Sequence, residues 1–197
     1  MGTRALFIPI NEWGEEICVI YTQFDGYPSG LPLLVARFLS KRRLVNAIPA
    51  GKDFEVINGM NDLVAQVVTL LKIAITHSCH SLSDIRRSSD VPITAGTIYV
   101  MPPGTRNIWE EYRYYIYPDD RYAELCKKEK ELLDKYEKVQ DDREKARAVA
   151  NMLRKITLNV INDSFGFKIK AVSVWSDREE VIFEGSPDDF VKKFSVE

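Results

Sequence analysis

The sequence has few of the residues on which the commonest catalytic sites depend. It contains two histidines and three cysteines among 197 residues. The motifs G-x-x-x-x-G-K-[ST], G-x-G-x-x-G, G-x-S-x-G and H-E-x-x-H do not occur. No pattern orients either histidine toward a serine or cysteine nucleophile. We therefore expect a non-enzymatic protein that uses no cofactor.

Metal binding is not expected either, although His77, Cys79 and His80 lie together in the stretch HSCH. A structural zinc site usually takes four ligands from two separated pairs, and adjacent ligands in one short loop give poor tetrahedral geometry. Cys18 and Cys126 are far from this stretch. An odd, scattered set of cysteines is typical of a reducing compartment and not of a disulfide framework.

Long apolar runs and a strong net charge are also missing. No run approaches the roughly 18 residues that a membrane helix needs. The first residues, MGTRALFIPI, lack the basic segment and cleavage site of a secretion signal, so the sequence predicts a cytoplasmic protein without a membrane partner. The net charge is −2 and the isoelectric point about 5.8. With a charge this small, the surface as a whole is not expected to attract nucleic acid. Binding of nucleic acid through Lys41–Arg43 or through the tyrosine-rich strand remains an alternative.

The residues that are present predict an α+β fold, with helices on a largely antiparallel sheet. Apolar and aromatic runs predict strands, and apolar residues at helical spacing predict helices. The loop IPAGKDFEVINGM is expected between the first two helices, and Asn58 or Asn61 is expected to cap the second. Strands are predicted at 5–10, 16–22, 97–101 and 112–117 and on both sides of SDRE, and helices from Pro32, over 63–71 and from Pro187.

Residues 119–162 differ from the rest because they contain no glycine or proline and have apolar residues at alternating four- and three-residue spacing. Polar residues interrupt this seam at Glu129, Arg143 and Thr157. One straight helix of this length would carry the chain about 65 Å from the sheet. We therefore predict a helical hairpin that breaks near Gln140, with Asp141 as a cap, and the unbroken spacing leaves one long helix as the alternative. The hairpin is interpreted as an insertion (119–162) in a core domain formed by 1–118 and 163–197, and as a surface for a protein partner or for self-association.

The stretch DGYPSG after the second strand raises the question of a ligand site. Asp25, Gly26, Tyr27 and Gly30 suit a tight turn that covers the core edge. Free amides at the following helix N-terminus would equally bind a phosphate. The second interpretation predicts a binder or hydrolase of a small phosphorylated or nucleotide ligand. The residues expected to complete its cleft are Asn58, Gly59, Arg106 and Glu110.

Several stretches resemble a family of uncharacterised proteins found in phages and prokaryotic genomes. They are TRA, IYTQFDGYPSG, NGMNDLVAQVVTLLK, GTIYVMPPGTRN, EEYRYYIY and VIFEGSPDDF, which are similar to the family pattern TRA…DGYPxG…NGMxxLxAQ. The resemblance spans about Thr3–Tyr117 and Phe167–Phe190 and implies a shared fold without an activity. Gln23 stands where relatives often have histidine, and Asn61 where they often have glycine. The family implies an accessory or regulatory protein of viral or mobile-element origin, located in the host cytoplasm.

Overall fold

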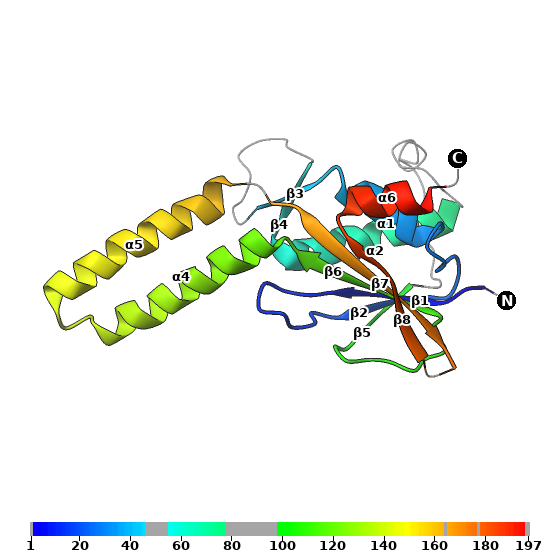
Figure 1. Ribbon diagram of the computed structural model, residues 1–197, viewed down its shortest axis with the longest axis horizontal. Coiled ribbons are helices and arrows are strands. Elements are labelled where there is room, and N and C mark those ends of the chain that lie inside the picture. Colours follow the sequence, from blue (N-terminus) through cyan, green and yellow to red (C-terminus); the bar gives the residue numbers. More distant parts are fainter. Residues whose placement is uncertain (1, 46–54, 78–97, 164, 177, 196–197) are drawn as a thin grey trace.

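The computed structural model describes residues 2–45, 55–77, 98–163, 165–176 and 178–195, and in them helices cover one face of a six-stranded sheet (Figure 1). The strand order is β5-β2-β1-β6-β7-β8. The predicted α+β class is confirmed. The strands are β1 Ala5–Pro9, β2 Val19–Thr22, β3 Arg43–Val45, β4 Val56–Asn58, β5 Ile98–Met101, β6 Tyr112–Pro118, β7 Phe167–Trp175 and β8 Arg178–Gly185. The helices are α1 Leu31–Leu39, α2 Gly59–His77, α4 Asp120–Lys138, α5 Arg143–Asn162 and α6 Pro187–Phe194.

The sheet is antiparallel except at its centre. Strands β1 and β6 run parallel, with Phe7 opposite Tyr114, and all the other neighbours in the six-stranded sheet are antiparallel. Strands β3 and β4 form a separate parallel pair. Strand β4 lies within the predicted loop IPAGKDFEVINGM, and β3 lies just before it. That prediction missed both strands because three residues are too few to show a period. Strand β3 also bonds to the chain beside β7, through Leu44 and Phe165.

The main core lies between the sheet and helices α1, α2 and α6. Alternate residues of β1 and β6 point into it, including Phe7, Tyr114 and Ile116, all at most 1% exposed. Tyr114 stacks on Phe7 at 5.4 Å between ring centroids and meets Phe190 of α6 edge-on at 6.2 Å. Each such buried side chain contributes about 1.5–3 kcal/mol to stability. The helix from Pro187 is confirmed, and Ser186 caps it by accepting a hydrogen bond from the Asp189 amide at 3.2 Å.

Helices α4 and α5 form an antiparallel hairpin that projects to one side of the sheet (Figure 1). We call this hairpin the arm. The predicted break near Gln140 is confirmed, since α4 ends at Lys138 and α5 begins at Arg143. The predicted cap was wrong by one residue. The side chain of Asp142, and not that of Asp141, accepts the hydrogen bond from the Lys145 amide at 3.2 Å.

The predicted seam lies between the two helices of the arm. Leu132, Tyr136 and Leu153 are half-buried there, and Val149 is buried. Two of the polar interruptions bond to each other, because Thr157 Oγ1 donates to Glu129 Oε1 at 2.5 Å. A polar pair in an apolar seam fixes the register of the two helices. The apolar seam therefore packs α4 against α5 within one chain.

The base of the arm is anchored in the core, and its far end is not. Tyr122, Cys126 and Val160 belong to the main core, and Tyr122 packs edge-on against Phe165 at 5.2 Å. Further out, Lys130 Nζ lies 4.8 Å above the ring of Trp13 in the β1–β2 turn. In the described residues, no helix combines the length and apolarity that a membrane crossing requires.

Candidate functional site

The DGYPSG loop closes the end of the sheet at which β1 begins. Asp25 has a positive φ of 53°, and the Gly26 amide donates to the carbonyl oxygen of Thr3 at 3.0 Å. The Gly26 carbonyl oxygen accepts from the Tyr114 hydroxyl at 2.8 Å. A Cβ atom on Gly26 would lie 2.6 Å from that of Ala5. The glycine thus permits the loop to approach β1 closely.

The amides at the start of α1 are already hydrogen-bonded. Leu31 donates to the Asp25 carbonyl oxygen at 2.9 Å, and Leu33 donates to that of Gly30 at 3.0 Å. Pro32, between them, has no N–H. The Gly30 amide donates to Tyr27 at 2.8 Å. An anion at this helix terminus would have to displace these bonds, so the start of α1 lacks the free amides on which the phosphate-binding interpretation depended.

Asn58 and Gly59 lie at the start of α2, beside the β1–β2 turn. The Asp62 side chain accepts from the Asn58 amide at 2.8 Å, which ties the residue before α2 to the first turn of the helix. The two residues line a hollow of about 510 Å³. This is within the usual size range of small-molecule sites. The other residues of the hollow are Asn11, Glu12, Trp13, Ile17, Met60, Asn61 and Tyr122.

The structure does not bring this hollow to the DGYPSG loop. Gly26 lies against Ala5 at the start of β1, whereas the hollow is lined by Asn11 and Glu12, beyond its end. The five residue steps from Ala5 to Ile10 span about 17 Å at the rise of a strand. The two groups of predicted ligand residues therefore lie at opposite ends of β1.

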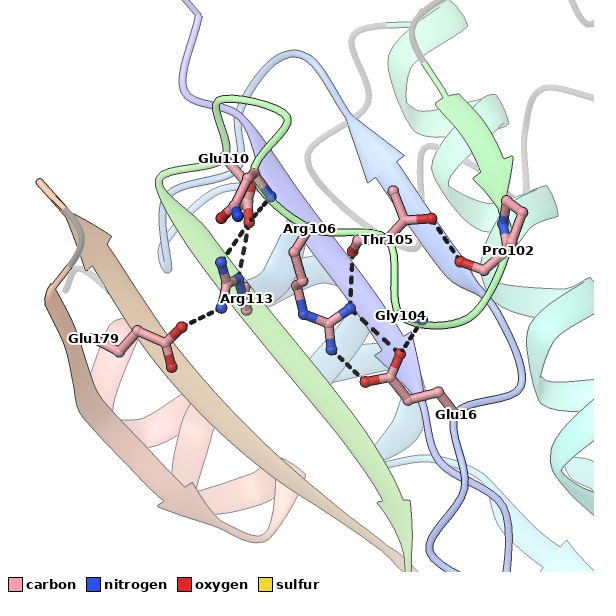
Figure 2. A network of polar contacts seen from close by, with 9 residues as sticks. Glu16, Pro102, Gly104, Thr105, Arg106, Glu110, Arg113 and Glu179 are labelled. Carbon is pink, nitrogen blue, oxygen red and sulfur yellow. Dashed lines mark hydrogen bonds and ion pairs between the residues drawn. The ribbon is translucent and has the colours of Figure 1, made fainter.

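Arg106 and Glu110 lie in the β5–β6 connection, which covers the face of the sheet away from the helices (Figure 2). Arg106 forms an ion pair with Glu16, whose second carboxylate oxygen accepts from the Gly104 amide at 2.7 Å. The guanidinium carbon of Arg106 lies 5.8 Å from the centroid of the Tyr115 ring. These contacts fasten the connection to the sheet, so the Arg106 side chain is occupied within the protein.

Glu110 is buried beside Arg113, with exposed fractions of 6% and 5% for the two residues. Glu110 Oε1 accepts from Arg113 Nε and Nη2 at 2.9 and 2.7 Å, and Arg113 also pairs with Glu179 of β8 (Figure 2). Burial alone would raise the pKa of Glu110. The hydrogen bonds from Arg113 and from the amides of Asn107 and Ile108 outweigh burial and hold that pKa below its ordinary value. This carboxylate is consequently a structural anion.

Two tryptophans are exposed to solvent near the Glu110–Arg113 pair, at the end of the sheet where β6 begins and β7 ends. Trp109 precedes Glu110, has a φ of 72° and is 78% exposed. Trp175, at the end of β7, is 74% exposed, and its neighbour Val174 donates its amide to Glu111 at 2.8 Å. A positive φ is strained for a bulky residue, so the buried Glu110–Arg113 pair holds an aromatic side chain in solvent at an energetic cost.

The tyrosine-rich strand is central in the sheet. Arg113 and Tyr114 are buried, and Tyr112, Tyr115 and Tyr117 are half-buried. None of the five side chains is presented for stacking on bases. Lys41 and Arg43 are exposed near the C-terminal end of α1.

The described cysteines are not activated. Cys18 and Cys126 are both buried, and burial raises the pKa of each thiol, that of Cys126 to about 11. A thiol that stays protonated at neutral pH is a poor nucleophile. The HSCH stretch beyond His77 lies outside the described residues. Elsewhere, within those residues, no three histidine, cysteine or acidic side chains are grouped to hold a metal ion.

The arm contains a group of charged residues that was not among the predicted site residues. Arg143, Arg147 and Arg154 are exposed on α5. The sequence carried a signal for them, because α5 contains five basic residues and a single acid, Glu144. The signal is visible only when charge is counted over one helix, since the whole chain is nearly neutral.

The chain matches no protein-family model, no curated protein and no solved structure.

Proposed function

We propose that the protein is a non-enzymatic accessory protein that binds a macromolecular partner through the arm. The observation that supports this most is the position of the arm, which is anchored at its base, whereas α4 continues for about 12 Å beyond Lys130. Its apolar seam is satisfied internally, so the outer surface needs no further contact for stability. A projection that adds little to the core is suited to reach a partner.

The cytoplasmic location and the viral or mobile-element origin belong to the same proposal. They rest on the resemblance in the DGYP and NGM stretches. If the protein has this location and origin, it acts inside the host cell on a host or viral macromolecule.

Site-specific photo-crosslinking tests the arm as the interface. A photo-reactive amino acid replaces Leu133 on the arm or, as a matched control, Val181 on β8, where the native side chains are 45% and 52% exposed. We expect adducts with a macromolecule from position 133 and none from position 181. Adducts from position 181 alone would place the interface on the sheet and overturn the proposal.

A shortened arm gives a second test. Removing residues 131–153 and closing the helices with a Gly-Ser loop of about four residues keeps Lys130 over Trp13 and the Glu129–Thr157 bond. We expect this variant to unfold cooperatively and to lose the partner. Retention of the partner by the folded, shortened protein would contradict the proposal.

A small polar ligand in the hollow beside Asn58 and Gly59 is the second candidate function, because the size and polar lining of the hollow favour it. A thermal-shift screen against nucleotides and sugar phosphates tests this candidate. A ligand at a hundred times its Kd stabilises the folded state by about 2.7 kcal/mol. We expect Asn58→Ala to abolish any such shift, whereas an unchanged shift in that variant would place the ligand elsewhere.

A further inference from the structure

The two helices of the arm differ in charge. Helix α5 carries five basic residues and one acid, a net charge of +4, whereas α4 carries six of each sign. Because the net charge of the whole chain is −2, everything outside α5 sums to −6. The chain as a whole therefore has a net negative charge, and the excess of positive charge is concentrated on one helix of the arm.

Three of the basic residues form a row on one side of α5. At 100° per residue, Arg143, Arg147 and Arg154 lie within about 40° of one another around the helix axis. Their Cα atoms span about 16 Å along the axis. All three are exposed, and Asn151, also exposed, lies beside the row. We call these three residues the arginine row.

The arginine row has no ion-pair partner among the acids that the structure describes. Among the described residues, none of its guanidinium groups forms an ion pair, whereas Lys145 on another side of the same helix pairs with Asp142 at 2.8 Å. Unpaired like charges at helical spacing destabilise a helix slightly. A bound polyanion would remove this repulsion and accept hydrogen bonds from the planar guanidinium groups.

The composition around the row distinguishes between classes of polyanion. A protein interface usually has an apolar or aromatic centre with charges at its rim. Leu158, in line with the row, lies beyond its Arg154 end, and α5 contains no aromatic residue. Without an aromatic side chain the helix lacks the ring platform on which proteins usually stack the successive bases of a single strand. A surface that is purely cationic matches the phosphate backbone of a duplex, where charge neutralisation dominates the affinity.

We propose that the arginine row binds the phosphate backbone of double-stranded nucleic acid without sequence preference. This inference rests on the proposed function of the arm and names the chemistry of its partner. It also differs from the expectation drawn from the net charge of −2, because the positive field is local to α5.

Fluorescence anisotropy with labelled duplexes of about 20 base pairs, DNA and RNA, tests the proposal on the full chain. Three phosphate contacts give a slope of about −2.7 for log K against log salt, or a loss of about 40-fold in affinity between 50 and 200 mM salt. The variant R143Q/R147Q/R154Q should bring the slope close to zero and lose most of the binding. Glutamine is a good helix former, and circular dichroism verifies that α5 is intact.

Two control variants separate position from charge. The variant K127Q/K135Q/K138Q removes the same charge from exposed positions of α4, and we expect it to change the affinity much less. The variant R143K/R147K/R154K keeps the charge and should retain most of the binding and of the salt slope. Equal losses in the α4 and α5 glutamine variants would overturn the proposal, because the position of the row would then not matter.

Three further results would overturn the proposal that the arginine row binds duplex nucleic acid. Absence of binding to either duplex at about 50 mM salt overturns the proposal. So does competition by polyglutamate as effective as that by duplex, because the row would then serve an acidic protein. If duplexes do not bind while position 133 still crosslinks to a protein, the arm remains the interface and only the nucleic-acid proposal fails.

Discussion

Gly26 lies where the DGYPSG loop meets strand β1, and it leaves no room for a side chain. A methyl group there would lie 2.6 Å from the Ala5 Cβ atom and 2.9 Å from the Ala5 amide nitrogen. Gly26→Ala is expected to lower the free energy of unfolding by about 1–3 kcal/mol, which urea denaturation measures. Gly166→Ala is the control, because no atom lies within 4 Å of its new methyl group. Equal losses in both variants would contradict the packing explanation.

Glu110 makes stability depend on pH in the acid range. Burial raises its pKa, but hydrogen bonds from Arg113 and two backbone amides bring the net pKa below the ordinary 4.5. A carboxyl group whose pKa is lower in the folded state stabilises that state above the unfolded pKa. This contribution is lost as the pH falls through the folded pKa. The wild-type protein should therefore lose stability below about pH 4.5.

Glu110→Gln is expected to remove part of that dependence. At pH 7 it leaves Arg113 buried without its main partner, which costs about 3 kcal/mol. Urea denaturation from pH 7 to pH 3 should give a flatter profile for this variant than for the wild type. Glu180→Gln, at an exposed position of β8, should leave the profile unchanged. A Glu110→Gln profile parallel to that of the wild type would show that Glu110 does not cause the acid loss.

At the scale of the element, the start of α5 depends on one side chain. Asp142 accepts from the Lys145 amide at 3.2 Å and pairs with Lys145 Nζ at 2.8 Å. Its loss leaves helix amides without a partner. Asp142→Ala should lower the midpoint of thermal unfolding and the helix content of the arm, as circular dichroism measures. Asp141→Ala, one residue earlier, should change neither, and the reverse result would move the cap back to Asp141.

The elements differ in how far the sequence predicts them. The arm was predictable because its seam repeats over many turns and its helix break contains a capping residue. The helix from Pro187 was predictable because Ser186 and Pro187 are local signals. Strands β3 and β4 were not, since each has three residues. The candidate site was the least predictable, because whether Arg106 is free or paired with Glu16 depends on a contact across 90 residues of sequence.

At the scale of the whole molecule, the arm and the sheet should differ in local stability. Strands β1 and β6 are central and buried, whereas most residues beyond Lys130 on α4 are exposed. Segments with few buried apolar contacts open at lower free energy. Hydrogen exchange measured by mass spectrometry should show faster exchange for residues 131–153 than for 5–9 and 112–118. Equal protection would show that the arm and the sheet open as one unit.

The parallel pairing of β1 with β6 also sets the order in which the protein can be made. Ala5 pairs with Tyr112, which the ribosome adds 107 residues later. At about 5–20 residues per second this interval lasts about 5–20 seconds. During that time β1 can pair with β2, but its other edge has no partner in the nascent chain. Strand β1, in which all five residues are buried in the folded protein, therefore waits half-paired until β6 emerges, and its open edge can pair wrongly during that period.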